Sequence, residues 1–103
     1  MSNDSIKIYF TKRVMDEIGA PIAFTIIKGV EMMNIKRDYL QIFKLDVIGN
    51  SLIVIEHSQE QPQWNTVYYM DTEGIEVKED ISGMKLYMII EDTYATLMLA
   101  EEY

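Results

Sequence analysis

The chain has 103 residues, 49% of them hydrophobic and 25% charged, a composition that supports one modest core and excludes extended disorder. It has no cysteine, which excludes disulfides, thiolate zinc sites and cysteine nucleophiles. No apolar run approaches the roughly 20 residues of a membrane-spanning helix, and the polar start Met1–Ser5 lacks a signal-peptide pattern. We therefore expect a cytoplasmic protein with a single domain over residues 1–103.

The net charge of −8 is unevenly distributed along the chain. Residues 1–50 carry seven Lys or Arg and six Asp or Glu, whereas residues 51–103 carry two Lys and eleven Asp or Glu, a balance of −9. Such a field repels the phosphates of nucleic acids and acidic membranes and attracts a basic protein surface. Acidic surfaces also keep small domains soluble without any specific partner, and that alternative stays open.

The first element in chain order is a strand. Residues 5–11 alternate Ile6, Ile8 and Phe10 with more polar neighbours, the period of a half-buried strand. A short polar stretch, Lys12–Gly19, follows and is expected to connect this strand to the next element.

A helix is predicted for residues 21–34. Pro21 suits its first turn because proline has a fixed φ. Gly29 inside a helix is unfavourable by ~1 kcal/mol relative to Ala, so a neighbour is expected to pack closely against it. The apolar residues that recur at helical spacing are Ile22, Ile26, Val30 and Met33.

A hairpin follows the helix. Residues 39–47 form a long strand whose apolar face is interrupted by Gln41. Gly49 and Asn50 tolerate the positive φ of a turn, and residues 52–56 return as a continuous apolar strand.

The rest of the chain reads as one loop and several short strands. The polar segment His57–Trp64 is predicted to be a loop. Residues 94–100 alternate like a strand, with a helix as the alternative. The other predicted strands are 66–70, 75–78 and 85–90, with turns at 71–74, 82–83 and 91–93.

These elements predict an α+β fold. We expect an antiparallel curved sheet of five to seven short strands, with one main amphipathic helix, about residues 21–34, on one face. Short connections between consecutive strands favour antiparallel pairing.

The sequence contains no recognisable catalytic or metal-binding constellation. His57 is the only histidine, and it is not accompanied by a Gly-x-Ser-x-Gly elbow or a glycine-rich phosphate loop. One histidine without cysteine does not make a common zinc site. Neighbouring acids lie at turns and at the end of the chain, where carboxylates are ordinarily solvated. We expect no enzyme activity, no cofactor and no metal.

Methionine and tyrosine are abundant, with eight Met and seven Tyr. Tyr68 and Tyr69 point to opposite faces of their strand, so one of them is expected to be exposed. Five methionines are expected to fill the core as flexible apolar side chains, with a Met-rich binding groove as the alternative. These are Met32, Met33, Met84, Met88 and Met98.

Three segments and the end of the chain resemble a known family. They are Tyr9–Val14, Asp38–Phe43, His57–Pro62 and the ending Thr96–Tyr103. Their order and spacing are similar to an uncharacterised family of small proteins from Firmicutes and their mobile elements, catalogued as domain of unknown function 960. The similarity extends from about residue 8 to the end of the chain, and it implies a fold but no activity.

A polar motif joins the hairpin to the predicted loop. If the hairpin turns at Gly49 and Asn50, Gln41 lies opposite residues 58–59 and can form a hydrogen bond with the segment after His57. Gln41, His57 and Gln59 are therefore predicted to be a structural polar motif. A binding site on the His57–Pro62 loop is the alternative.

The acidic second half predicts a protein-interaction module, not an enzyme, that docks a partner with a basic surface. One form is an inhibitor from a phage or other mobile element that mimics DNA, as anti-CRISPR proteins do. Direct binding to nucleic acid or a membrane is not expected, and the oligomeric state stays open. The alternatives are a small ligand-binding protein or enzyme that uses the loop His57–Trp64, and a self-associating structural domain. The predicted partner-binding residues are Glu60, Trp64, Tyr69, Asp71, Glu73, Glu76, Glu91 and Asp92.

Overall fold

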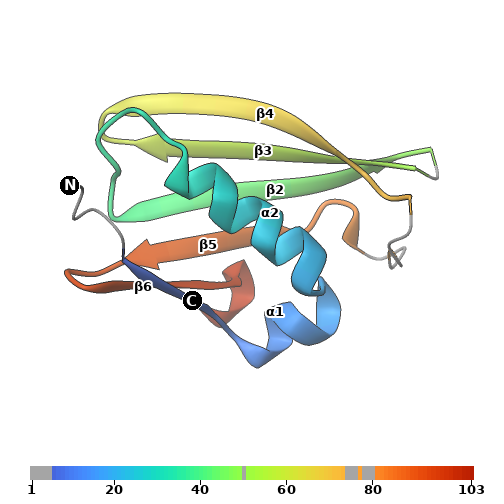
Figure 1. The fold of residues 1–103 in the computed structure, drawn as a ribbon, viewed down its shortest axis with the longest axis horizontal. Coiled ribbons are helices and arrows are strands. Elements are labelled where there is room, and N and C mark those ends of the chain that lie inside the picture. Colours follow the sequence, from blue (N-terminus) through green and yellow to red (C-terminus); the bar gives the residue numbers. More distant parts are fainter. Residues whose placement is uncertain (1–5, 50, 74–76, 78–80) are drawn as a thin grey trace.

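The computed structural model describes residues 6–49, 51–73, 77 and 81–103 (Figure 1). The six strands in these residues form one sheet in the order β1-β6-β5-β2-β3-β4, and α2 runs across one face of it. The elements are β1 (Lys7–Phe10), α1 (Lys12–Glu17), α2 (Ala20–Glu31), β2 (Leu40–Ile48), β3 (Leu52–Glu60), β4 (Gln63–Asp71), β5 (Lys85–Ile90), β6 (Tyr94–Leu99) and the 3-10 turn η2 (Ala100–Glu102).

The core lies between α2 and the sheet. The buried residues of α2 follow the predicted helical spacing, because the side of the helix that faces the strands is apolar. β2 and β3 bury alternate residues on the face that α2 covers, since successive side chains of a strand point to opposite faces. The predicted α+β fold with one main helix is confirmed. The buried residues of α2 are Ile22, Ala23, Ile26 and Val30.

One strand pairing differs from the prediction. β1 pairs with β6 in parallel, with Lys7 opposite Tyr94 and Phe10 opposite Leu97, so the sheet is mixed. The other four pairs are antiparallel, as predicted. The antiparallel rule applies to strands joined by short connections. Most of the chain separates β1 from β6, so their connection does not impose that direction.

The stretch predicted as a polar connection, Lys12–Gly19, contains the short helix α1. Thr11 caps this helix, because its Oγ1 accepts a hydrogen bond from the Val14 amide at 3.2 Å. Lys12 pairs with Asp16 at 2.8 Å, one helical turn later. Val14 is the residue of α1 that is buried, so the segment is polar overall and yet helical.

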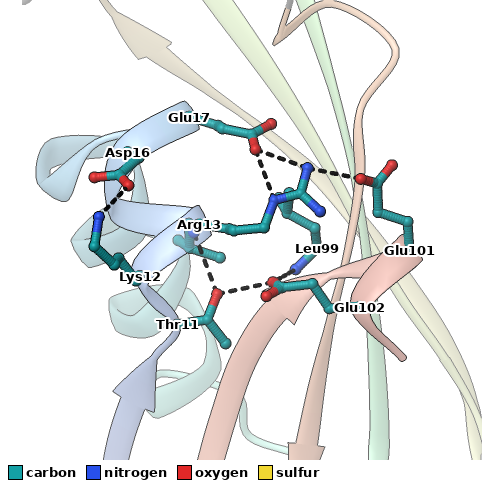
Figure 2. A network of polar contacts seen from close by, with 9 residues as sticks. Thr11, Lys12, Arg13, Asp16, Glu17, Leu99, Glu101 and Glu102 are labelled. Atoms are coloured by element: carbon teal, nitrogen blue, oxygen red, sulfur yellow. Dashed lines mark hydrogen bonds and ion pairs between the residues drawn. The ribbon is translucent and has the colours of Figure 1, made fainter.

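Polar contacts attach the start of α1 to the end of the chain (Figure 2). Thr11 Oγ1 donates to Glu102 Oε1 at 2.8 Å, and the same carboxylate oxygen accepts from the Leu99 amide at 2.9 Å. Arg13 Nη2 lies 2.6 Å from Glu101 Oε2. These contacts fix η2 beside α1, at the end of the β1–β6 pair.

Helix α2 ends earlier than predicted. It follows Gly19, whose φ of 95° suits glycine, and ends at Glu31 rather than Asn34. The Arg37 Nε donates to the carbonyl oxygen of Val30 at 3.1 Å, and the same oxygen accepts from the Met33 amide at 3.2 Å, so side-chain and backbone donors both satisfy this acceptor near the helix end. The chain can therefore leave the helix there and turn toward β2.

The hairpin of β2 and β3 is confirmed, but its second strand is longer than predicted. Gly49 has a φ of 61°, as the predicted turn requires, whereas Asn50 lies outside the described residues. β3 continues to Glu60, so the loop predicted at His57–Trp64 is wrong. β3 and β4 are joined by a two-residue turn at Gln61 and Pro62, whose peptide bond is cis. The segment is polar because His57 and Gln59 face the interior of the protein, where their side chains form hydrogen bonds.

The C-terminal strands follow the prediction. β5 has the predicted bounds, and the ambiguous segment 94–100 is a strand up to Leu99 that ends in η2. The predicted strand at 75–78 falls almost entirely outside the described residues, and Val77, which is described, is not in a strand.

Candidate functional site: a groove beside an unpaired strand

Hydrogen bonds join the three residues of the predicted polar motif. His57 Nε2 lies 2.7 Å from Gln41 Oε1, and Gln41 Nε2 donates to Gln59 Oε1 at 2.7 Å. All three side chains are buried. The register of β2 and β3 pairs Ile42 with Ser58, which brings Gln41 next to Gln59 as the hairpin predicted.

Backbone carbonyls fix the orientation of both amides. Gln59 Nε2 donates to the carbonyl oxygens of Lys36 and Pro62, each at 2.9 Å, so its Oε1 faces Gln41. Gln41 therefore donates through Nε2 and turns its Oε1 toward His57. Because an amide oxygen only accepts, the imidazole donates through Nε2–H and carries its lone pair on Nδ1.

His57 is an uncharged core residue. Its ring stacks on Phe43 with centroids 4.4 Å apart and lies nearly perpendicular to the ring of Trp64, with centroids 4.9 Å apart. Burial lowers the pKa of His57 to about 4, because the charged imidazolium loses its hydration. Its Nδ1 has no hydrogen-bond partner in the described part of the chain. The imidazole is therefore neutral near pH 7.

The same network fixes the segment after α2 against the turn between β3 and β4. The Asp38 amide donates to Gln59 Oε1 at 2.9 Å, and Asp38 Oδ2 accepts from the Gln61 amide at 3.0 Å. Gln41 Nε2 also donates to the Asp38 carbonyl oxygen at 2.9 Å. The polar motif thus sets the position of the C-terminal end of α2 relative to β4.

A groove of about 660 Å³ lies between α2 and β4, and we call it the α2–β4 groove. Its strand side is formed by alternate residues of β4 that face the helix. Its lining is predominantly apolar, as is typical of sites that bind apolar groups. The residues that line it are Phe24, Thr25, Lys28, Gly29, Met32, Met33, Asn34, Trp64, Thr66 and Tyr68.

The close neighbour expected at Gly29 is Tyr68. A Cβ on Gly29 would lie 2.6 Å from the Tyr68 hydroxyl oxygen, which is closer than real Cβ atoms approach. That hydroxyl is buried and makes no hydrogen bond in the described part of the chain, and burial raises the pKa of Tyr68 to about 12. Gly29 and Tyr68 therefore set how closely α2 approaches β4.

Two large apolar side chains are exposed at the groove, one within α2 and one at the residue that directly follows it. Phe24 is 58% exposed and Met32 is 71% exposed. The prediction that Met32 fills the core is therefore wrong, whereas Met88 is fully buried. Met32 and Met33 both line the groove, and the alternative of a Met-rich binding groove stays a prediction.

The predicted partner-binding residues do not form one surface. Glu60 and Trp64 lie at one end of β4, and Asp71 and Glu73 lie at the other end. Tyr69 is 61% exposed on the sheet face opposite α2, and Tyr68 of the same pair is directed inward. Glu91 and Asp92 occupy the turn between β5 and β6, separated from β4 by β2 and β3. Glu76 lies outside the described residues.

No protein-family model matches this chain, and no curated protein matches it significantly. Its fold is similar to the crystal structure of a protein of unknown function from Enterococcus faecalis. The TM-score is 0.77 at 14% sequence identity, over 98% of this chain and 93% of the other. The likeness shows the fold alone. The resemblance to domain of unknown function 960 stays a prediction.

Within the described ranges, no group of three or more His, Asp or Glu side chains is placed to hold a metal ion. No helix in the same ranges is long and apolar enough to cross a membrane.

Sequence reasoning missed Phe24 and Lys28 as groove residues. Both lie on the predicted helix but not among its regularly spaced buried residues, so the sequence pattern places them on the surface. The signal that pointed to the groove was Gly29, because a glycine inside a helix implies a close neighbour. That signal does not name the neighbouring strand, which only the tertiary structure provides.

Proposed function

We propose that this protein is a non-enzymatic interaction module that binds an apolar segment of a protein partner in the α2–β4 groove. The observation that carries this proposal is a groove of about 660 Å³ with an apolar lining at which Phe24 and Met32 are exposed. Exposed apolar surface in a soluble domain marks interaction sites, because it is unfavourable in water unless a partner covers it.

The groove replaces the carboxylate surface as the proposed contact site. A DNA mimic presents carboxylates in a row that follows phosphate spacing. The predicted carboxylates within the described residues divide between the two ends of β4 and the β5–β6 turn. The inhibitor form, including an anti-CRISPR role, stays a prediction, and the basic character expected of the partner is retained.

The proposal is tested with peptides selected from a random display library against the intact protein. The best peptide is synthesised, and its dissociation constant is measured for the wild type and for Met32→Ser. Because Met32 is mostly exposed, the variant should fold normally, and affinity should fall roughly fivefold to tenfold as an apolar contact is lost.

Met15→Ser is the matched control. Met15 is also exposed, at 45%, but it lies on α1, away from the groove. The proposal predicts unchanged affinity for this variant. If no peptide is selected, or if both substitutions change affinity equally, the groove is not the binding site.

A further inference from the structure

We propose that the partner binds as an extended basic strand added to the free edge of β4. This inference rests on the proposed function and names the form and charge of the bound segment. β4 is the outermost strand at one edge of the sheet (Figure 1), and its side chains line the α2–β4 groove. Adding a strand to such an edge is a recurrent mode of peptide recognition, in which main-chain hydrogen bonds give affinity and side-chain pockets give specificity.

The hydrogen-bond pattern shows which backbone groups of β4 face outward. The Thr72 amide donates to the Ser51 carbonyl oxygen at 3.1 Å, which continues the register between β3 and β4. Backbone groups of successive residues in a strand point to opposite sides, so the even-numbered residues of β4 bond to β3. The N–H and C=O groups of Asn65, Val67 and Tyr69 therefore point to the free edge.

Within the described residues, β4 lacks the short length, the proline and the lysine that ordinarily prevent strand pairing at an edge. β4 has nine residues, so it extends for roughly 30 Å. Its sequence, QWNTVYYMD, contains no proline, lysine or glycine, and its one charge is at the last residue. Natural proteins ordinarily shorten, charge or cover such an edge to prevent pairing. A long edge without charge inside it can therefore pair with a strand from another molecule.

The groove lies where alternate side chains of an added strand would point. Trp64, Thr66 and Tyr68 project from β4 toward the helix side and form the strand side of the groove. An added strand places every second side chain on that same face. Those side chains would contact Met32 and Phe24, so the bound segment should be apolar at alternate positions.

Charge distinguishes between the possible occupants. The hairpin from Leu52 to Glu73 contains four acidic residues and no Lys or Arg. A segment with Lys or Arg between its apolar positions or at its ends complements this charge. A second copy of the chain would instead bring a hairpin with the same four carboxylates beside this one, and the like net charge of the two hairpins opposes that approach. The acidic residues are Glu56, Glu60, Asp71 and Glu73.

The test is Val67→Pro, measured with the synthetic peptide selected against the wild type. Proline removes an outward N–H without deleting a hydrogen bond to β3, and edge strands tolerate proline at such positions. Affinity should fall roughly tenfold, because a main-chain hydrogen bond is lost and the strand edge is disturbed. Val67→Thr keeps the N–H and is the matched control, and a thermal melt checks that both variants fold.

The outcomes separate this inference from the proposed function. If Met32→Ser weakens binding and Val67→Pro does not, the groove binds a segment that is not a strand, and the inference is wrong. If neither substitution changes the affinity for the peptide, the proposed function is wrong as well. The inference that the partner is basic would be wrong if the selected peptides had no excess of Lys and Arg. It would also be wrong if the affinity did not decrease with added salt. A dimer that forms as protein concentration rises and is lost in Val67→Pro would identify a second copy as the occupant instead.

Discussion

The two edges of the sheet are built differently. β1 has four residues, carries Lys7 and leads directly into the capped helix α1. β4 has nine residues, and its interior carries no charge. A hydrogen bond between Thr11 and Glu102 joins the segments that follow β1 and β6. β4, in contrast, has a groove of about 660 Å³ on the side that faces α2.

This difference indicates which edge of the sheet is the better candidate for binding. A short charged edge that ends in a capped helix offers little backbone for pairing. A long uncharged edge exposes unpaired N–H and C=O groups along its whole length. The contrast within one sheet is the reason why we propose binding at β4 and a structural role for β1.

The largest expected effect comes from removing the network that holds α2 beside β4. Gln59→Leu removes the side-chain partner of the Asp38 amide and of the Lys36 and Pro62 carbonyls, and it removes one of the hydrogen bonds of Gln41. Each unsatisfied buried group costs about 1–3 kcal/mol, so we expect the free energy of unfolding to fall by about 4 kcal/mol. Urea denaturation measures this change.

Gln63→Leu is the control for that measurement. Gln63 is an exposed glutamine at the start of β4, so the same substitution there should change the free energy of unfolding by less than about 0.5 kcal/mol. Equal losses in the two variants would show that the buried network does not stabilise this side of the sheet.

The next effect is a dependence of stability on pH through His57. Its pKa is about 4 in the folded protein, below the ordinary value of 6.5, so the unfolded chain binds a proton first as the pH falls. The stabilisation is therefore fully present above about pH 6.5 and is lost as the pH falls toward 4. Between about pH 7.5 and about pH 5 the free energy of unfolding should fall by about 2 kcal/mol.

Denaturation curves of the wild type and His57→Gln at several pH values test this prediction. The variant is expected to be less stable at neutral pH and to lack most of the slope above pH 5. A wild type whose stability is flat over that range would mean that the imidazole is hydrated in the folded protein.

A smaller effect is expected where α2 and β4 meet. Gly29→Ala places a Cβ against the Tyr68 hydroxyl, so we expect a loss of about 1–2 kcal/mol, although alanine has the better helix propensity. Tyr68→Phe removes a buried hydroxyl that has no hydrogen-bond partner in the described part of the chain, and it should relieve part of that loss. A double-mutant cycle measures the coupling. Additive effects would contradict the close approach.

The smallest effect is expected at the opposite edge. Thr11→Ala removes the cap of α1 and the contact with Glu102, which should reduce the free energy of unfolding by about 1 kcal/mol. Thr93→Ala, in the exposed β5–β6 turn, is the control. Peptide affinity should be unchanged in both variants. Weaker binding by Thr11→Ala would show that the two edges are not independent.

Most of the strands could be predicted from the sequence because their side chains alternate. β5 has the predicted bounds, and the hairpin around Gly49 places Gln41 beside Gln59 as its register requires. The segment after His57 was predicted to be a loop because its side chains are polar. Their partners come from residues 36–41, about twenty positions away, and a local pattern does not contain that information.

The helix α1 had a signal in the sequence that the prediction did not use. Lys12 and Asp16, like Arg13 and Glu17, are spaced by four residues, as ion pairs on a helix are. The parallel pairing of β1 had no such signal, and for the α2–β4 groove Gly29 indicated only a close neighbour of the helix and not which strand provides it. Both depend on elements that are distant in sequence, so they follow only from the assembled sheet.

We propose that the free edge of β4 accepts a strand and that the edge of β1 does not. Amide hydrogen exchange followed by NMR, with and without the selected peptide, tests it most directly. We predict that the amides of Asn65, Val67 and Tyr69 exchange rapidly in the free protein and slow by at least roughly tenfold in the complex, while the amides of β1 are unchanged. Protection on β1, or none on these three residues of β4, would contradict the account.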